Sequence, residues 1–288
     1  MPNSARPADA SGTFELGGDL KVNRLGYGAM QLTGPGIWGD PKDPAEAVRV
    51  LQRAVELGVN FIDTADAYGP FVSEQLIKKA LHPYAKDLII ATKAGLTRSG
   101  PGIWIPVGRA EYLKQQVELS LRHLGVERID LLQLHRIDPK VPLAESLGAL
   151  TDLQKAGKIR HIGLSEVSVD ELEQARKLAK IVSVQNLFNL TNRAAEPLLD
   201  HATKLGIAFI PWFPLATGKL AGSGGPLDKL AEKHRATPSQ LALVWLLKRS
   251  PVMLPIPGTS SVKHLEENVA GAEVELTDAE LASIDKAV

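Results

Sequence analysis

The stretch IDLLQLHRIDPKVPLAESLGALTDLQKAGKIRHIGLS, residues 129–165, contains the pattern that decides the fold. It begins and ends with runs that are apolar in their middles, Ile129–His135 and Ile159–Ser165, and an amphipathic helical segment separates them. Gly157 stands just before the second run, where a glycine in the left-handed conformation commonly ends a helix. Apolar strands joined by helices are typical of a parallel sheet that is buried on both faces.

The same alternation of strand and helix recurs along most of the chain. The candidate strands are Leu25–Gln31, Phe61–Asp66, Leu88–Ala94, Ile129–His135, Ile159–Ser165, Val182–Phe188, Ile207–Pro214 and Met253–Gly258. This pattern matches an α/β fold, the (β/α)8 TIM barrel. The alternative is an open doubly wound sheet, whose glycine-rich dinucleotide fingerprint should follow the first strand. QLTGPGIWGD, residues 31–40, does not fit that fingerprint, so the barrel is favoured.

Signals at helix ends agree with this assignment. Pro44–Leu57 carries apolar residues at positions 47, 48, 51, 54 and 55, which form one stripe of a helix, and Gly58 ends it. Ser168, with Glu171 three residues later, has the pattern of a capping box.

Two further elements flank the predicted barrel. Thr13–Val22 reads as a β-hairpin around Gly17-Gly18, which we expect to cover the bottom of the barrel. Leu276–Val288 reads as a short C-terminal helix with Thr277 as its N-cap. Residues 1–12 are expected to form a flexible leader, and residues 13–288 a single domain.

Composition excludes several classes of function. The chain has no cysteine, which excludes disulfides and thiolate chemistry. Its 33 basic and 33 acidic residues leave no net charge, so it is a poor candidate for binding nucleic acid. The cleanest apolar run, Leu241–Leu247, is far shorter than the roughly 20 residues of a membrane-spanning helix. Since MPNSARPADASG has no apolar signal-peptide core, we expect a cytoplasmic protein without a membrane partner, and a monomer by default.

Polar residues stand where three successive strands end. Asp63 and Tyr68 follow the second strand, Lys93 ends the third and His135 the fourth. The catalytic residues of a barrel lie at this face. A tyrosine becomes a usable general acid when a lysine ammonium stabilises its phenolate, and an aspartate can hold that ammonium charged. The set requires no metal.

Each residue alone has a simpler explanation. Asp63 could be a helix cap or a turn residue, Tyr68 could pack on the surface, and His135 could be an ordinary buried histidine. Lys93 is harder to explain, because an unpaired lysine in a buried strand is costly. The joint placement at one face of one barrel favours catalysis.

Seven motifs resemble the aldo-keto reductase superfamily, from about Arg24 to Asn268. They are FIDTADAYG, ATKAG, LLQLHRID, GLSE, VQNLFN, PWFPLA and IPGTSSVKHLEEN. The resemblance implies a barrel that binds a nicotinamide cofactor without a Rossmann fold. It also implies that Tyr68 is the general acid, that Lys93 lowers its pKa, that Asp63 pairs with Lys93 and that His135 orients the carbonyl.

The resemblance also implies the cofactor contacts. Ser165 and Gln185 would hold the nicotinamide carboxamide, and Trp212 would stack on the ring, where the family usually has tyrosine. The expected contacts are Gly28, Met30, Ser165, Gln185, Trp212, Phe213, Pro214, Leu215, Gly218, Lys219, Gly258, Thr259, Ser260, His264, Glu267 and Asn268.

The chain departs from the family pattern at three positions. Glu166 replaces a frequent asparagine, Gly258 a frequent lysine, and His264 the usual arginine. The last two changes remove fixed charge near the expected adenosine 2′-phosphate, but Lys263 and the nearby hydroxyls remain. NADPH is therefore favoured over NADH.

The substrate is expected to be a small carbonyl compound. Trp38, Trp104 and Arg136 are candidates for the substrate pocket, although the tryptophans could clamp helices and Arg136 could form a salt bridge on the rim. The closest resemblance is to a bacterial branch that includes pyridoxal reductases, which suggests pyridoxal or small aromatic aldehydes. The alternative is a cofactor-binding sensor that resembles potassium-channel beta subunits.

Overall fold

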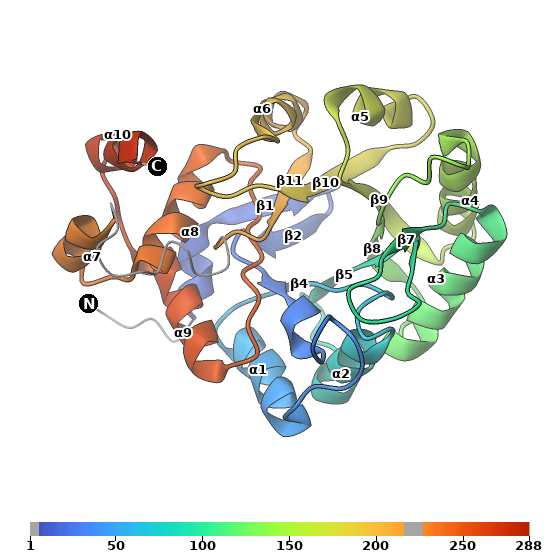
Figure 1. Ribbon diagram of the computed structural model, residues 1–288, viewed down its shortest axis with the longest axis horizontal. Coiled ribbons are helices and arrows are strands. Elements are labelled where there is room, and N and C mark those ends of the chain that lie inside the picture. The colour runs from blue at the N-terminus through green and yellow to red at the C-terminus, as the bar shows by residue number, and fades with distance from the viewer. Residues whose placement is uncertain (1–5, 216–226, 288) are drawn as a thin grey trace.

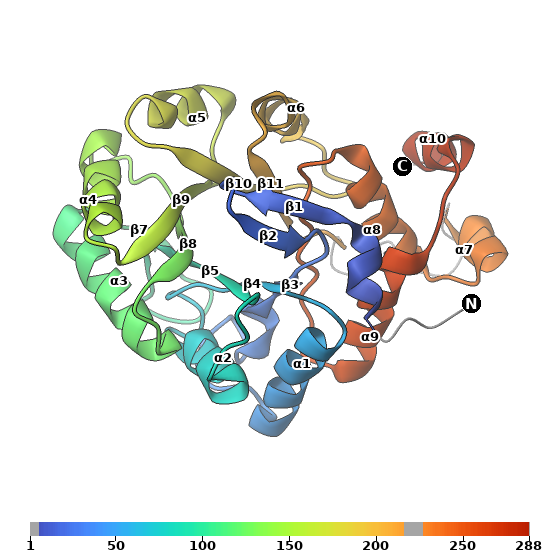
Figure 2. The same ribbon diagram turned by 180° about the vertical axis from the view of Figure 1, so that it is seen from behind.

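A curled parallel sheet inside a ring of helices forms the body of the protein. The computed structural model describes residues 6–215 and 227–287. Seven parallel strands follow the order β11-β10-β9-β8-β5-β4-β3. They are β3 (Tyr27–Gly28), β4 (Phe61–Asp63), β5 (Ile89–Ala94), β8 (Ile129–Leu134), β9 (Ile159–Ser165), β10 (Ile181–Leu187) and β11 (Ala208–Trp212). Figure 1 and Figure 2 show the helices around the outside of this sheet.

The helices alternate with the strands, as the sequence predicts. They are α1 (Pro44–Glu56), α2 (Val72–Leu81), α3 (Ala110–Leu124), α4 (Leu143–Lys155), α5 (Val169–Arg176), α6 (Glu196–Leu205), α7 (Asp228–His234), α8 (Pro238–Arg249), α9 (Val262–Ala270) and α10 (Asp278–Ala287). Short 3₁₀ helices lie at Pro7–Ser11, Ala29–Leu32 and Gly271–Glu273. Ser168 and Glu171 form the predicted capping box, and Gly58 adopts a φ of 93°. None of the helices in the described ranges is long and apolar enough to cross a bilayer.

The predicted eighth strand, Met253–Gly258, is not a strand. The segment still closes the gap between the two sheet edges. The Phe209 amide donates to the Val252 carbonyl, the Leu254 amide donates back to Phe209, and the Gly26 amide donates to Pro255. Pro255 and Pro257 lack amide hydrogens, so a regular ladder cannot form here.

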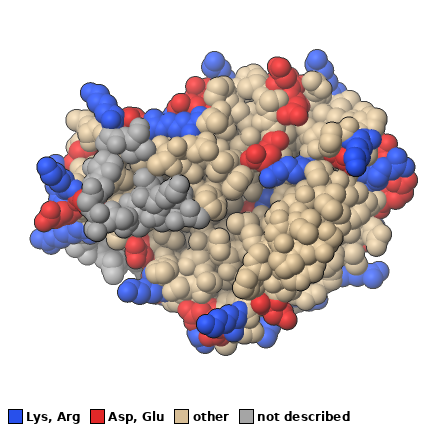
Figure 3. All heavy atoms as spheres, in the orientation of Figure 1, with Lys and Arg blue, Asp and Glu red and all other residues tan. Residues whose placement is uncertain are grey.

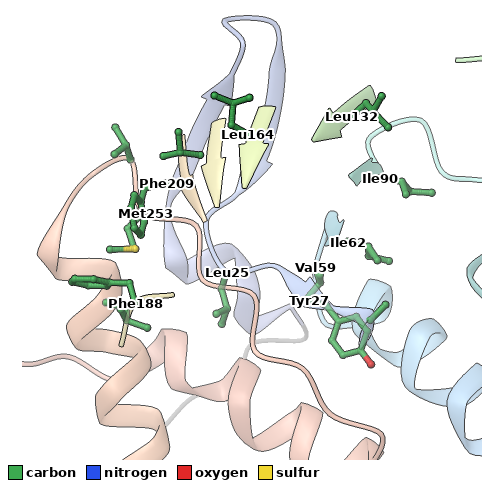
Figure 4. Close-up of a cluster of buried hydrophobic side chains, with 14 of the residues drawn as sticks. Leu25, Tyr27, Val59, Ile62, Ile90, Leu132, Leu164, Phe188, Phe209 and Met253 are labelled. Atoms are coloured by element: carbon green, nitrogen blue, oxygen red, sulfur yellow. The ribbon is translucent and has the colours of Figure 1, made fainter. Parts of the chain in front are cut away.

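Alternate residues along each strand face different apolar layers, which explains the uniformly apolar strands. One layer packs against the helices, and Figure 4 shows Leu25, Tyr27, Val59, Ile62, Ile90, Leu132, Leu164, Phe188, Phe209 and Met253 from it. The other layer fills the barrel and includes Phe61, Ile89, Ala91, Leu131, Val182, Ala208 and Ile210. Because both faces of the sheet are buried, the sequence of a strand does not alternate between apolar and polar residues.

A hairpin covers the end of the barrel that Figure 2 shows in front. Strands β1 (Thr13–Leu16) and β2 (Leu20–Asn23) pair antiparallel through a turn in which Gly17 and Gly18 both have positive φ. Leu16, Leu20 and Val22 pack into the layer that fills the barrel. The bottom of the barrel is therefore plugged.

The N-terminal residues that the structure describes are packed against the domain. The Ala8 amide donates to the Leu57 carbonyl at 3.1 Å, and Pro7, Ala8 and Ser11 are buried. The prediction of a flexible leader is therefore wrong for residues 7–11.

Candidate active site

The four predicted catalytic residues meet at the end of the barrel opposite the hairpin. Asp63 ends β4, Tyr68 lies in the loop after it, Lys93 lies in β5 and His135 directly follows β8. All four side chains are buried; Tyr68, the most exposed, has only 6% of its surface accessible. Neighbouring parallel strands place their carboxyl ends side by side, which brings these distant residues together.

Lys93 connects the aspartate to the tyrosine. Its Nζ donates to Asp63 Oδ1 at 2.5 Å, to the Thr64 carbonyl at 2.9 Å and to the Tyr68 hydroxyl at 3.2 Å. These three acceptors use all three hydrogens of the ammonium group. The buried charge is thus both paired and hydrogen-bonded.

Two glutamine amides hold the other oxygen of Asp63. Gln133 Nε2 donates to Asp63 Oδ2 at 3.0 Å, and Gln185 Nε2 donates to the same oxygen at 2.9 Å. Sequence reasoning missed Gln133. A signal was present, because Gln133 precedes His135 by two positions at the end of β8, and residues two apart along an extended chain share a face. Gly163 on β9 makes room for it, since a Cβ there would lie 3.0 Å from Gln133 Cγ.

The surroundings set the protonation states of Tyr68 and Lys93. Burial raises the pKa of Tyr68, and the nearby Lys93 charge lowers it only in part. Lys93 thus lowers the Tyr68 pKa, as the sequence predicts, while burial outweighs it and sets the net direction. Burial also opposes the charged form of Lys93, but Asp63 and Tyr68 together outweigh it and the Lys93 pKa is raised. The site thus holds a protonated phenol beside an ammonium ion.

His135 is held in its neutral form. Burial lowers its pKa well below the usual value, and the charges of Lys93, Arg136 and Arg98 lower it further. Its ring lies edge-on to Tyr68, with 5.9 Å between the centroids. A neutral imidazole can donate one hydrogen bond without adding another charge to the site.

Two cavities meet at Tyr68. One of about 210 Å³ is lined by Gly28, Met30, Gln31, Asp63, Tyr68, Gln185, Trp212, Phe213, Pro214, Leu215, Ile256, Pro257 and Gly258. The other, of about 410 Å³, is lined by Met30, Ile37, Tyr68, Leu96, Trp104, Pro106, His135, Arg136, Ser165, Gln185 and Trp212. The first collects half of the sixteen predicted cofactor residues, and the second holds the predicted substrate residues Trp104 and Arg136. Four residues, including Tyr68 and Trp212, line both.

Trp212 is fixed by the unusual Glu166. Glu166 Oε1 accepts from Trp212 Nε1 at 2.5 Å and from the Leu187 amide at 2.8 Å. Glu166 has a φ of 56°, so its backbone is in the left-handed region. Trp212 and Glu166 thus complement each other, because an indole N–H needs an acceptor and the carboxylate supplies one.

The remaining cofactor candidates surround the start of α9. Ser260 lines a third cavity of about 730 Å³, the Thr259 hydroxyl accepts from the Ser261 amide, and His264 is exposed. Glu267 and Asn268 lie further along α9, with Asn268 buried. Gly218 and Lys219 lie outside the described residues.

Arg98, which sequence reasoning also missed, ties together the loops around the second cavity. Its guanidinium donates to the carbonyls of Gly36, Ile37, Ala67, Gly100 and Ile103. Its Cζ lies 3.6 Å from the centroid of the Trp104 ring. Trp104 in turn lies edge-on to Tyr68 and His135, with 6.3 Å between centroids in each pair. An arginine within an irregular loop gives no sequence signal for such a role.

Trp38 is not in the predicted place. Trp38 is not among the described residues that line the two cavities at Tyr68, whereas its neighbour Ile37 lines the second. The Trp38 ring lies 5.6 Å from the Arg98 guanidinium instead. Side chains at successive loop positions point in different directions, which the sequence alone does not resolve.

Comparison with known proteins gives a consistent result. The sequence pattern of the Aldo/keto reductase family matches residues 24–288. An uncharacterized oxidoreductase of Schizosaccharomyces pombe is 53% identical over 99% of this chain and 92% of its own length. Pyridoxine 4-dehydrogenase of Escherichia coli is 44% identical over 96% of this chain and 98% of its own.

Solved structures show the same architecture. A thermostable aldo-keto reductase in complex with the inhibitor epalrestat has a TM-score of 0.86, with 31% identity over 96% of this chain and 99% of that one. The glycerol dehydrogenase of Gluconobacter oxydans has a TM-score of 0.88, with 29% identity over 96% of this chain and 95% of that one.

Proposed function

Because this chain is an oxidoreductase that belongs to the aldo/keto reductase family, we propose that it reduces aldehyde carbonyls to alcohols with NADPH. Its substrates are small aromatic aldehydes, pyridoxal among them, and Tyr68 is the proton donor. One observation carries the proposal: Tyr68 lines both cavities, and its hydroxyl accepts a hydrogen bond from Lys93.

The proton comes from the Tyr68 hydroxyl. Burial keeps this phenol protonated, so the hydrogen is present when a carbonyl arrives. As the proton leaves, the Lys93 ammonium stabilises the phenolate, and Asp63 keeps Lys93 charged. Gln133 and Gln185 hold Asp63 in place. The bound cofactor supplies the hydride, so the carbonyl gains one hydride at carbon and one proton at oxygen.

Tyr68 and His135 together stabilise the charge that develops on the carbonyl oxygen. Both line the second cavity, and neither carries a positive charge before reaction. Donors that are fixed in a buried site need no rearrangement during the reaction, which is the usual source of such stabilisation.

The groups that suit a nicotinamide carboxamide, which needs one donor and one acceptor, lie where the two cavities meet: Gln185 and Trp212 line both, and Ser165 lines the second. Ser165 Oγ already accepts from Arg136, so its hydrogen is available to a carbonyl. Gln185 uses its Nε2 on Asp63 and Gln133, which leaves Oε1 available to accept. Trp212, fixed by Glu166, offers a flat ring for stacking.

An acidic side chain of α1 caps the start of α9 and bears on the choice of cofactor. The Val262 amide donates to Glu46 Oε1 at 3.0 Å, and Arg49 contacts Glu46 Oε2 at 2.6 Å. The Val262 amide and Arg49 lower the Glu46 pKa, so the carboxylate is ionised. A 2′-phosphate held by Ser260 and His264 would lie near this negative charge.

We therefore expect Glu46→Gln to increase the preference for NADPH. The amide oxygen can still cap Val262, but the charge is gone. The ratio of kcat/KM for NADPH to that for NADH should rise about threefold to fivefold, the usual size of a charge effect at a helix N-terminus. Glu56→Gln makes the same change at the exposed far end of α1 and should leave the ratio unchanged. An unchanged ratio in Glu46→Gln would remove this part of the proposal.

The second cavity favours flat, apolar substrates. Trp104 and Trp212 line it together with Ile37, Leu96 and Pro106. Pyridoxal is a flat aldehyde of suitable size, and the relative with 44% identity is named pyridoxine 4-dehydrogenase. Initial rates of NADPH oxidation with pyridoxal and with 4-nitrobenzaldehyde test this choice. Turnover of nitrobenzaldehyde alone would exclude pyridoxal and keep the reaction class.

Arg98→Lys should weaken the binding of aromatic substrates. Lysine keeps the charge but has only three donors, and it cannot span five carbonyls or stack flat on Trp104. We expect KM for 4-nitrobenzaldehyde to rise about tenfold, with a smaller change for propanal, which does not reach the tryptophan. The NADPH dissociation constant should stay within about threefold, as expected for a change confined to one pocket. Equal losses with both aldehydes would contradict this role.

A further inference from the structure

Arg136 lines the second cavity, Arg98 packs on Trp104 of its wall, and the hydrogen bonds of the two arginines differ. Arg98 places its donors on main-chain carbonyls. Arg136 uses only Nη1, which donates to the His135 carbonyl at 2.7 Å and to Ser165 Oγ at 3.1 Å. Within residues 6–215 and 227–287, Arg136 Nε and Nη2 have no hydrogen-bond acceptor. One guanidinium is saturated by the fold, and the other keeps donors available.

Arg136 is held in place rather than free to swing. It follows the catalytic His135 at the end of β8, and its bond to Ser165 ties it to the end of β9. The side chain is only partly exposed and lines the cavity. Figure 3, in the orientation of Figure 1, shows that most of the Lys, Arg, Asp and Glu on this face lie around the rim.

No carboxylate pairs with Arg136 among the described residues. Burial lowers the pKa of Arg136, and the charge of Glu166 opposes that change. Glu166 Oε1, however, accepts from the Leu187 amide and the Trp212 indole rather than from Arg136. The other residues of the cavity are apolar or neutral, such as Leu96, Pro106 and Trp104. A guanidinium with free donors and no direct ion pair binds an anionic oxygen strongly.

We propose that Arg136 binds a negatively charged oxygen on the substrate. The preferred substrates are then aldehydes that carry a carboxylate or phenolate on the same small frame as the carbonyl. This inference rests on the proposed carbonyl reduction and names the substrate class for it. Because Arg136 adjoins His135, binding the anion also directs the carbonyl toward Tyr68 and His135.

The other use of these donors is the cofactor. In that role, Arg136 would orient Ser165 toward the nicotinamide carboxamide instead of binding the substrate. The two roles predict different results: a substrate role changes the selectivity between charged and neutral aldehydes, and a cofactor role changes the affinity for NADPH.

The test compares 3- and 4-carboxybenzaldehyde with their methyl esters, which share the frame and lack the charge. For at least one acid, kcat/KM should exceed that of its ester by about tenfold, mainly through KM, as expected for a charge-assisted hydrogen bond. Arg136→Met should reduce this ratio to about one. The ester should lose less than the acid because it makes no such bond, so the acid-to-ester ratio, and not the total activity, is the quantity that decides.

Arg128→Met is the matched control. Arg128 is exposed just before the opposite end of β8, so this variant removes the same charge far from the cavity, and the acid-to-ester ratio should not change. The inference is overturned if Arg136→Met keeps the wild-type acid-to-ester ratio of kcat/KM. It is also overturned if this variant instead raises KM for NADPH. If wild type reduces neither acids nor esters, the proposed function itself fails, and the inference fails with it.

A measurement on the wild-type protein covers the case in which Arg136→Met does not fold. Benzoate and benzamide are compared as inhibitors of 4-nitrobenzaldehyde reduction. Benzoate should inhibit competitively and about tenfold more strongly, for the same charge-assisted bond. Equal inhibition by the two compounds would overturn the proposal.

Discussion

Tyr68→Phe should lower kcat/KM for aldehyde reduction by about 10³–10⁴-fold, near the upper range for a lost general acid. The change removes one hydroxyl that accepts from Lys93 at 3.2 Å and leaves the ring between the two cavities. Binding of NADPH, followed by quenching of tryptophan fluorescence, should change little because the aromatic wall remains. The expected loss is therefore in kcat.

Tyr84→Phe controls for the loss of a tyrosine hydroxyl. Its hydroxyl donates to the Leu124 carbonyl at 2.5 Å, away from the cavities at Tyr68. Activity should stay within about twofold of wild type, as for most changes outside a site. If Tyr68→Phe keeps more than a tenth of the wild-type activity, Tyr68 is not the proton donor.

Lys93→Met should cause the largest loss of stability. It leaves Asp63 as a buried carboxylate without its counter-charge, and breaking a buried pair in this way costs about 3–5 kcal/mol. The side chains of both partners are almost fully buried, at 1% and 2% exposure, so water cannot replace the lysine. Urea unfolding followed by circular dichroism measures the change. Reduction should also be abolished, because nothing stabilises the Tyr68 phenolate.

The double variant Asp63→Asn, Lys93→Met separates stability from catalysis. It removes both charges, so most of the lost free energy of unfolding should return. Activity should remain absent. A double variant that stays as unstable as the single one would show that the charge pairing is not the reason for the loss, and a double variant that regains activity would exclude Lys93 from the reaction.

Much of the fold could be predicted because its signals are local. Each of the strands β5, β8, β9 and β10 is rich in apolar residues, and glycines such as Gly58 mark helix ends. The prediction of a strand at Met253–Gly258 was wrong because it rested on hydropathy alone. The prolines in this segment lack the amide hydrogens that a strand needs for its ladder. The first predicted strand, Leu25–Gln31, is a strand only at Tyr27–Gly28, because the chain turns into a 3₁₀ helix at Ala29.

The site was predictable where its residues end strands. Asp63, Lys93 and His135 could be placed together because a barrel brings strand ends to one face. Arg98 could not, because its acceptors are main-chain carbonyls in three separate loops, and a carbonyl has no sequence signature. The net pKa direction of Tyr68 also depends on burial, which outweighs the charge that the motif supplies.

The most direct test of the account is to follow the hydride. Wild-type protein is incubated with NADPH that carries deuterium at the reactive C4 position, together with 4-nitrobenzaldehyde, and the alcohol is examined by mass spectrometry. The account predicts many turnovers, with one deuterium on the carbinol carbon for each cofactor oxidised. Cofactor oxidation without alcohol, or a reaction that stops after one turnover as in a sensor, would contradict it.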